Sequence, residues 1–332
     1  MLSTIGHLDG HVVHCARLVS DHGVEVDIIG LGAAVVGWRV PVAGGLRSVV
    51  LGSTDLATAL RLPAYVGSVV GRVANRIPGA QFRLGSERYT VDANEGPTCL
   101  HGGAAGLSKQ VWRLELDTSA CAVRATHTSP HGAMGFPGTV DFEVTWRLRG
   151  DTLSMEVEAR PDCPTPLALT QHIYFNLDGG GTILRHRLRV DADHTLAVDA
   201  ARCPTGARVA VAGTVRDLRS PAALAVDGVA RPLDHHFVLR SDRGVHHPPV
   251  ELHSGDGALM LSLWTDRAGV QVYDGSGLPS SVEGWPGVGP WSGLCLEDQD
   301  SPAALAHPEL GDIVYGPERT YRHRCRLRIG AP

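Results

Sequence analysis

An arginine and a histidine stand in motifs that could bind a small polar molecule. Arg76 lies in Gly-Arg-Val-Ala-Asn-Arg-Ile at positions 71–77, and His101 lies in Leu-His-Gly-Gly at positions 100–103. The arginine offers a planar fork of donors, and the histidine can donate or accept a hydrogen bond near neutral pH. The pair predicts recognition of a ligand that is covered with oxygen atoms.

A second histidine and a glutamate follow later in the chain. His172 lies in Leu-Thr-Gln-His-Ile-Tyr-Phe-Asn-Leu at 169–177, and Glu297 lies in Ser-Gly-Leu-Cys-Leu-Glu-Asp-Gln-Asp at 292–300. Each ends an apolar run, so we expect each to sit where a strand leaves the core. A general acid and a general base are the minimum equipment for moving protons on a sugar.

Both residues also have plainer interpretations. A lone histidine before the apolar Ile173 is, on spacing alone, more typical of a structural residue that makes a hydrogen bond. Glu297 follows three apolar residues, and a half-buried strand would point it inward, where an unpaired carboxylate is costly. That cost favours either a functional role or an ion pair for Glu297.

The composition excludes several classes of protein. Of 332 residues, 43% are hydrophobic and 20% are charged, and 40 glycines with 21 prolines indicate many turns between short elements. The net charge of -5 comes without a basic block, so we expect no nucleic-acid partner. With no linker or repeat, we expect one domain over residues 1–332, because all-β sandwiches often reach this length.

The N-terminus has no basic leader or apolar signal segment, and no stretch approaches 18 uninterrupted apolar residues. We therefore expect a cytoplasmic protein with no membrane partner. Its seven cysteines are odd in number, widely spaced and without a C-x-x-C pair, which favours reduced thiols. Lys109 is the only lysine and lies in a polar segment, which disfavours Schiff-base chemistry.

Alternation with a period of two predicts strands. Residues 152–159 alternate polar and apolar side chains, and residues 322–329 alternate arginine with mostly apolar residues. We interpret the arginines of the second segment as a solvated sheet face. Turn signals at 84–87 and 149–151 indicate hairpins, so we expect antiparallel β-structure throughout.

Helical patterning is scarce. We expect short capped helices only after Asp55 and after Ser220. The segment 275–293, just before Glu297, is rich in glycine and proline and predicts a long loop. That loop could be a mobile rim of the site or a plain surface excursion.

The ordered motifs together resemble the aldose 1-epimerases, also called galactose mutarotases. The resemblance covers nearly the whole chain and includes Leu-Asp-His-His-Phe-Val-Leu at 233–239 and Gly-Val-Gln-Val-Tyr-Asp-Gly at 269–275. It implies a large antiparallel β-sandwich that interconverts the α and β anomers of a free aldose such as galactose or glucose. It also implies that no cofactor or metal is needed, and it leaves a monomer and a homodimer open.

The resemblance assigns roles to individual residues. It implies that Glu297 is the base and His172 the acid. The substrate-binding residues that it implies are Asn75, Arg76, His101, Tyr174, Asp234 and Gln271. Such a pair predicts a bell-shaped pH profile, and we expect a nearby carboxylate to raise the pKa of His172 above its free value of about 6.5.

The neighbours of the site depart from the family pattern. Gln171 and Ile173 flank His172 where asparagine and serine are common, and Trp291 stands where a histidine is common. These departures leave open which sugar is preferred, but they do not change the reaction that the resemblance implies.

Two other functions compete with this interpretation. A non-catalytic carbohydrate-binding sandwich would keep Arg76 and Asp234 without needing an acid and a base. A glycosidase would use two carboxylates, and Glu297 could pair with Asp234 for that purpose.

Two apparent motifs carry no function. A dinucleotide fingerprint at 30–37 fails because its third glycine would fall at Val35. The histidine pairs 235–236 and 246–247 would point to opposite faces of a strand, so each pair is poorly placed to share a metal ion.

Overall fold

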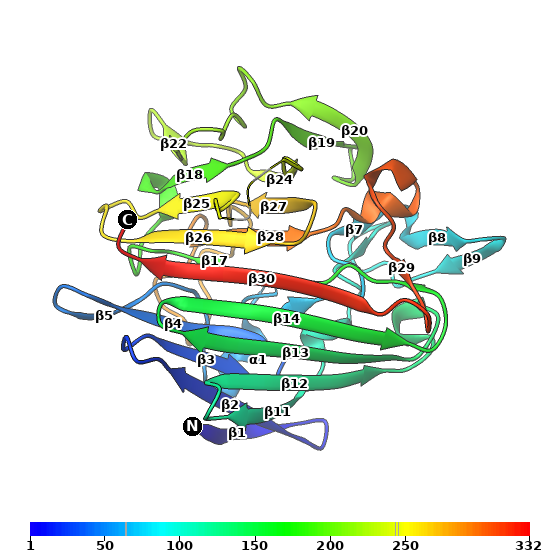
Figure 1. The fold of residues 1–332 in the computed structure, drawn as a ribbon, viewed down its shortest axis with the longest axis horizontal. Helices are drawn as coiled ribbons and strands as arrows, with labels where there is room; N and C mark the ends of the chain where they lie inside the picture. The colour runs from blue at the N-terminus through cyan, green and yellow to red at the C-terminus, as the bar shows by residue number, and fades with distance from the viewer. Residues whose placement is uncertain (64, 243, 245) are drawn as a thin grey trace.

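Two large antiparallel sheets dominate the computed structural model, which describes residues 1–63, 65–242, 244 and 246–332 (Figure 1). The nine-stranded sheet has the order β11-β12-β13-β14-β30-β26-β25-β18-β21. In chain order its strands are β11 (Arg113–Asp117), β12 (Ala122–Ser129), β13 (Val140–Arg149), β14 (Thr152–Pro161), β18 (Arg187–Val190), β21 (Ala222–Ala223), β25 (Val250–His253), β26 (Met260–Thr265) and β30 (Tyr321–Gly330).

The second large sheet has six strands in the order β17-β28-β27-β24-β19-β20. Its strands are β17 (Tyr174–Phe175), β19 (His194–Val198), β20 (Pro204–Ala210), β24 (Asp234–Val238), β27 (Gly269–Tyr273) and β28 (Leu294–Gln299). A five-stranded N-terminal sheet consists of β1 (Leu2–Leu8), β2 (His11–Val19), β3 (Glu25–Ile29), β4 (Ala34–Val42) and β5 (Gly45–Ser48).

Short strand pairs connect these sheets and carry parts of the site. They include β6 (Val69–Val70) with β16 (Thr170–Gln171), and β7 (Arg76–Ile77) with β10 (Cys99–Leu100). The hairpin β8 (Gln81–Leu84) and β9 (Glu87–Thr90) turns at 84–87, and β13 and β14 turn at 149–151, so both predicted hairpins are confirmed.

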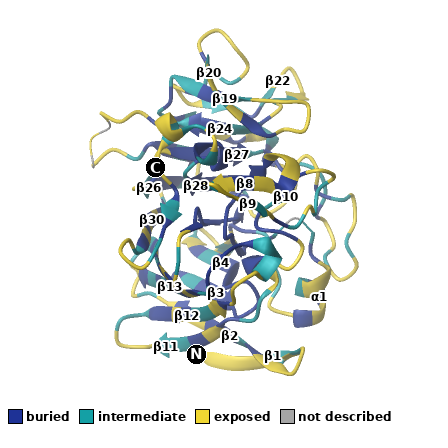
Figure 2. Cartoon of the chain, turned by 90° about the vertical axis from the view of Figure 1, so that its right-hand side faces the viewer, coloured by how far each residue is buried: buried dark blue, intermediate teal, exposed yellow. Residues whose placement is uncertain are grey.

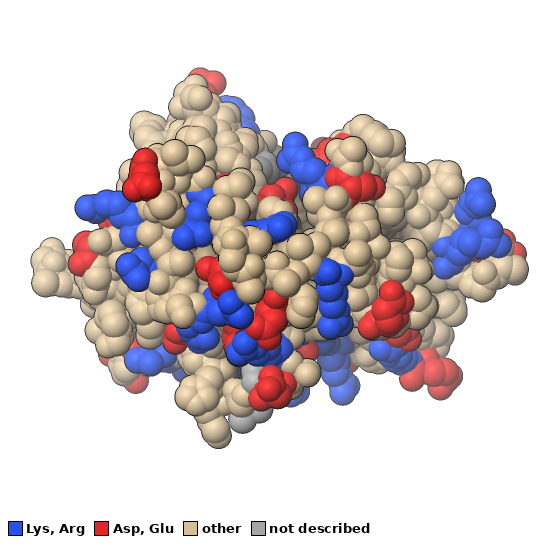
Figure 3. Space-filling view, turned by 90° about the horizontal axis from the view of Figure 1, so that it is seen from above, with Lys and Arg blue, Asp and Glu red and all other residues tan. Residues whose placement is uncertain are grey.

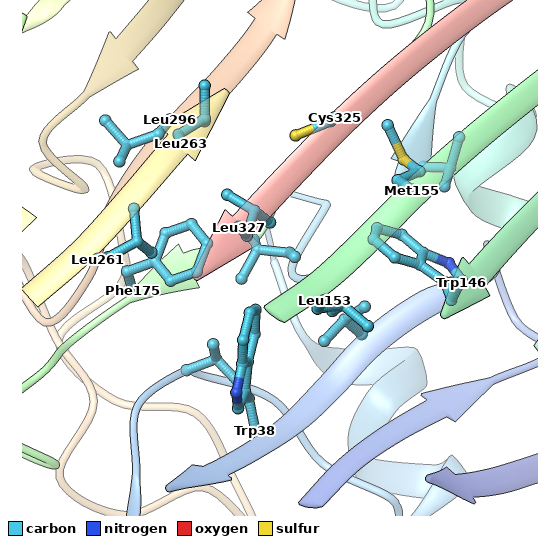
Figure 4. Close-up of a cluster of buried hydrophobic side chains, with 14 of the residues drawn as sticks. Trp38, Trp146, Leu153, Met155, Phe175, Leu261, Leu263, Leu296, Cys325 and Leu327 are labelled. Atoms are coloured by element: carbon cyan, nitrogen blue, oxygen red, sulfur yellow. The ribbon is translucent and has the colours of Figure 1, made fainter. Parts of the chain in front are cut away.

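The predicted alternation is confirmed in β14 and β30. Met155 on β14 lies opposite Cys325 on β30, and both are buried. Figure 4 shows these side chains in one buried cluster with Trp146 of the neighbouring strand β13 and Trp38 of β4. Figure 2 shows the buried residues in dark blue on the inner strands, while β1 and most loops are exposed. One buried face on each sheet is therefore what holds the sandwich together.

The opposite face of β30 is solvated, as the alternation predicts. Arg322, Arg324, Arg326 and Arg328 are all exposed. Arg322 lies 3.7 Å from Glu158, and the guanidinium of Arg326 lies 5.1 Å from the ring centroid of Trp264. Figure 3, which shows the molecule from above, has basic and acidic side chains interspersed over the surface seen from that side.

One of the two predicted helices is confirmed. The helix α1 (Leu56–Arg61) begins after Asp55, whose carboxylate accepts a hydrogen bond from the Thr58 amide. The prediction after Ser220 is wrong, because Ala222–Ala223 pairs with β18 as β21 instead. The same hexapeptide, Ser-Pro-Ala-Ala-Leu-Ala, recurs at 301–306 and does form a capped 3₁₀ turn there. Strand pairing therefore overrides local propensity at the first copy.

None of the seven cysteines, all of which lie in the described part of the chain, forms a disulfide. Among the described residues, no helix has the length and apolar character that crossing a membrane requires.

Candidate active site

A polar hollow of about 170 Å³ gathers all eight of the predicted site residues. They come from the short strand pairs, from the link between β16 and β17, and from β24, β27 and β28. The hollow is lined by Asn75, Arg76, His101, His172, Tyr174, Asp234, Gln271 and Glu297, and also by Tyr65, Glu95, Leu100, Arg202 and Tyr273. Segments more than 200 residues apart in sequence thus converge on one small volume.

The six-stranded sheet supplies one wall. Gln271 on β27 lies directly opposite Glu297 on β28, so the two side chains share a face of the sheet. The side-chain amide of Gln271 donates to Asp234 Oδ1 at 2.6 Å, although its own Oε1 is buried without a partner among the described residues. This wall therefore carries both donor and acceptor groups, which suit a ligand rich in hydroxyl groups.

Arg76 is held in place by a glutamate that sequence patterns did not single out. Its guanidinium donates to both Glu95 carboxylate oxygens, at 2.6 and 2.9 Å, and lies 3.9 Å from Asp234. This bidentate geometry leaves Arg76 few rotamers, and the side chain is 9% exposed. Glu95 thus orients Arg76 and offsets its charge.

A tight connection orients His101. Both Asn75 (φ 63°) and His101 (φ 53°) adopt the left-handed conformation. The backbone N–H of Asn75 donates to His101 Nδ1 at 3.2 Å. A neutral ring that accepts at Nδ1 carries its hydrogen on Nε2, so the remaining nitrogen is a donor.

That tautomer bears on whether the hollow suits a metal ion. His101, His172 and Glu297 place one potential ligand atom each within 4.8 Å of one another. A metal ligand must offer a lone pair, whereas Nε2 of His101 carries a hydrogen in this arrangement. The three residues therefore suit hydrogen bonding to oxygen better than coordination of a metal.

His172 and Glu297 form the most enclosed part of the hollow. His172 Nε2 lies 3.7 Å from Glu297 Oε1, and both side chains are buried. The other ring nitrogen of His172 lies 3.5 Å from the Cys295 thiol. Glu297 Oε2 is buried without a hydrogen-bond partner among the described residues. An acid–base pair with a free, inward acceptor is what proton transfer on a bound hydroxyl requires.

Burial sets the pKa values of this pair. Burial lowers the pKa of His172 to about 4. Burial, reinforced by the carboxylate of Asp234, raises the pKa of Glu297 well above its usual value. Burial, with His172 and Arg76 acting in the same direction, also lowers the pKa of His101 well below its usual value. The expectation that a carboxylate raises the His172 pKa above about 6.5 is wrong, because desolvation by burial lowers that pKa instead.

Sequence reasoning missed four polar side chains that line the hollow: Tyr65, Glu95, Arg202 and Tyr273. Arg202 lies in a turn with φ 60° and places its guanidinium 3.9 Å from Asp234. Tyr65 packs edge-on against the His101 ring at 4.6 Å. No periodic pattern marks these residues. For Glu95 alone, an acidic residue six positions before His101 could have indicated a partner for Arg76.

A wider hollow of about 870 Å³ lies on the outer face of β13, β14, β26 and β30. It is lined by solvated arginines such as Arg149, Arg324 and Arg326. Its residues include no pair of buried acid and base, so size does not identify the site. The smaller hollow around Glu297 is the candidate.

The chain is similar to known proteins along nearly its whole length. A family model described as aldose 1-epimerase matches residues 14–328. The galactose mutarotase of Mus musculus is 36% identical over 322 residues, which cover 95% of this chain and 93% of the relative. The aldose 1-epimerase of Escherichia coli K12 is 31% identical over 314 residues, covering 91% and 90%. The crystal structure of an aldose epimerase homologue from C. elegans superposes with a TM-score of 0.89 at 27% identity and covers 96% of this chain and 99% of that one.

Proposed function

Because the chain belongs to the aldose 1-epimerase family, and so interconverts the α and β anomers of a free aldose, we propose that His172 and Glu297 are the residues that move the protons. The relatives named galactose mutarotase support galactose as a substrate, and glucose is the next candidate. Arg76, His101, Asp234 and the other predicted binding residues hold the sugar hydroxyl groups.

The proposed reaction needs one base and one acid. Glu297 takes the proton from the anomeric hydroxyl while His172 gives a proton to the ring oxygen, and the bond between C1 and the ring oxygen breaks. The aldehyde end of the open chain then rotates, and closure returns both protons in the reverse order. The Nε2–H of His101 donates a hydrogen bond near the ring oxygen of the sugar during ring opening and closure.

The pair works with a single proton between its two members. The pKa shifts of His172 and Glu297 favour that proton on Glu297 in the protein by itself. A bound sugar offers its anomeric O–H to the Glu297 carboxylate, which lines the hollow, and hydrogen bonding to the carboxylate favours the ionised form. Substrate binding thus moves the pair toward an ionised glutamate and a protonated histidine, the form that the assigned roles require.

The observation that carries the proposal is the buried Glu297 carboxylate, which places Oε1 3.7 Å from His172 Nε2 and leaves Oε2 without a partner among the described residues. The test is polarimetry or NMR of freshly dissolved pure anomers of galactose, glucose, xylose and arabinose, with and without protein. We expect faster equilibration of at least one aldose without added metal or nucleotide, at a rate that a chelator does not change. If the protein accelerates the equilibration of none of these aldoses, the proposal that it is an enzyme is excluded.

Hydrolysis of a glycoside separates the proposal from a glycosidase, in which Asp234 would serve as the second carboxylate. Asp234 instead accepts from Gln271 and lies near two arginines, which supports a role in binding. A protein that only binds carbohydrate would tolerate loss of His172 or Glu297 without a change in affinity.

We propose in addition that residues 1–332 form one domain that acts as a monomer or homodimer in the cytoplasm. One continuous hydrophobic cluster that includes residues from all three larger sheets supports the single domain. The seven unpaired cysteines support a reducing compartment. Size-exclusion chromatography with light scattering measures the oligomeric state.

A further inference from the structure

His172 lies where the chain leaves β16 and enters β17. The two residues of β17 pair with the first two residues of β28 in antiparallel register. Continued by one step, this register places Ile173 opposite Leu296; by a second step, it places His172 opposite Glu297. The proposed acid and base are thus register neighbours just beyond the end of the regular ladder.

A side chain interrupts the ladder at that step. The Tyr174 carbonyl accepts from Leu51 on the far side of the strand, so the N–H of the preceding residue, Ile173, faces β28. This N–H does not bond to Leu296. It donates instead to Gln171 Oε1 at 3.0 Å, and Gln171 Nε2 donates to the Leu296 carbonyl at 2.6 Å.

The amide of Gln171 therefore lies between two backbone groups that the register would pair directly. Its partners are the residue after His172 and the residue before Glu297. The side chain is fully buried, so water cannot replace either hydrogen bond. One amide thus sets how far apart the two strands stand where the proposed acid and base leave them.

From this arrangement we propose that Gln171 is a positioning residue that fixes the separation of His172 and Glu297. The inference rests on the roles proposed for those two residues. Gln171 does not line the hollow, so its effect passes through the backbone on each side. Shifts of about 1 Å in reacting groups can cost roughly 10²-fold in rate.

The test compares two buried glutamines. Gln171→Met keeps the length of the side chain and removes both hydrogen bonds. Gln299→Met is the matched control, because Gln299 is also fully buried, lies two residues after Glu297, and has a side-chain amide without partners among the described residues. Each variant is assayed for kcat, KM and their pH dependence, with activity normalised to the folded fraction.

We expect Gln171→Met to lower kcat by roughly 10²-fold with little change in KM, and to move both limbs of the pH profile. Gln299→Met should retain native values of all three. If Gln171→Met does not fold, Gln171→Glu serves instead, because its protonated form keeps both hydrogen bonds and its ionised form loses the one to Leu296. Its kcat should then fall as the new carboxyl ionises.

Equal kcat values and equal pH profiles for the two methionine variants would overturn the proposal. The same experiment includes His172→Ala and Glu297→Gln. If these lose turnover while Gln171→Met does not, only the positioning role is overturned. If they retain turnover, the proposed roles fail, and the positioning role fails with them.

Discussion

Two strands of this protein carry polar side chains to opposite effect. β30 points four arginines outward, where water solvates each one. β28 is buried along its whole length, and its Glu297 faces a hollow with one oxygen unpartnered. A polar residue on the first strand costs little because water surrounds it, whereas the same polarity on the second is unfavourable until a ligand supplies hydrogen bonds.

Burial, rather than the number of charged groups, therefore marks the reactive site. Burial moves the pKa of Glu297 upward and that of His172 downward. Both shifts bring the pair toward a state in which one proton can move between them. Arginines of β30 line a larger hollow, but their side chains are exposed.

The largest expected effect is on turnover. Glu297→Gln and His172→Ala should each lower kcat by roughly 10²-fold or more, as loss of a positioned acid or base does. Glu297→Gln should not destabilise the fold, because it removes the cost of burying a carboxyl group whose pKa is raised. Polarimetry measures the first effect and thermal unfolding the second. Near-native turnover in Glu297→Gln would make His101 the leading candidate for the base.

The dependence of the rate on pH tests the pKa shifts of His172 and Glu297. The rate should rise as His172 loses its proton near its pKa of about 4, because only then does the pair contain a base. The rate should fall at higher pH as Glu297 loses its proton at its raised pKa, because the pair then contains no acid. The descending limb of kcat/KM therefore belongs to Glu297.

The measurement that checks this order is the profile of each variant. Residual activity of Glu297→Gln should lack the high-pH descending limb, whereas that of His172→Ala should rise as Glu297 ionises, because Glu297 is then the only base of the pair. If Glu297→Gln instead keeps the descending limb, His172 is the group that titrates at the higher pH, as it would among free side chains.

Sequence alone could predict the sandwich and the principal members of the site. Alternation with a period of two identified the buried and exposed faces of β14 and β30, and ordered motifs identified residues such as Arg76 and Glu297. It could not predict the pKa order, because desolvation depends on which segments cover His172. It could not predict Arg202 either, because its partner Asp234 lies on a distant strand.

The two copies of Ser-Pro-Ala-Ala-Leu-Ala show the same limit within the fold. The copy at 301–306 forms a capped turn, and the copy at 220–225 contributes β21 to the edge of the nine-stranded sheet. Their local propensities are identical, so only tertiary context separates them.

A smaller effect is expected where the site binds rather than reacts. Asp234→Ala should raise KM by roughly 10-fold, the size expected from losing hydrogen bonds to a charged acceptor, and should leave kcat within a few-fold. Initial rates over a range of galactose concentrations separate the two constants. A fall in kcat comparable to that of Glu297→Gln would indicate the two-carboxylate chemistry of a glycosidase instead.

The smallest effect is expected for an exposed arginine of β30. Arg324 shares β30 with the core residue Cys325, but its side chain is exposed and has no ion pair or hydrogen bond to another described residue. Arg324→Ala should therefore change the free energy of unfolding by no more than about 0.5 kcal/mol and leave kcat and KM unchanged. Chemical denaturation and the anomer assay measure these quantities on one preparation. A tenfold loss of activity would contradict this contrast between the two strands. It would mean that a solvated arginine on the outer sheet acts on a reaction whose residues line the hollow around Glu297.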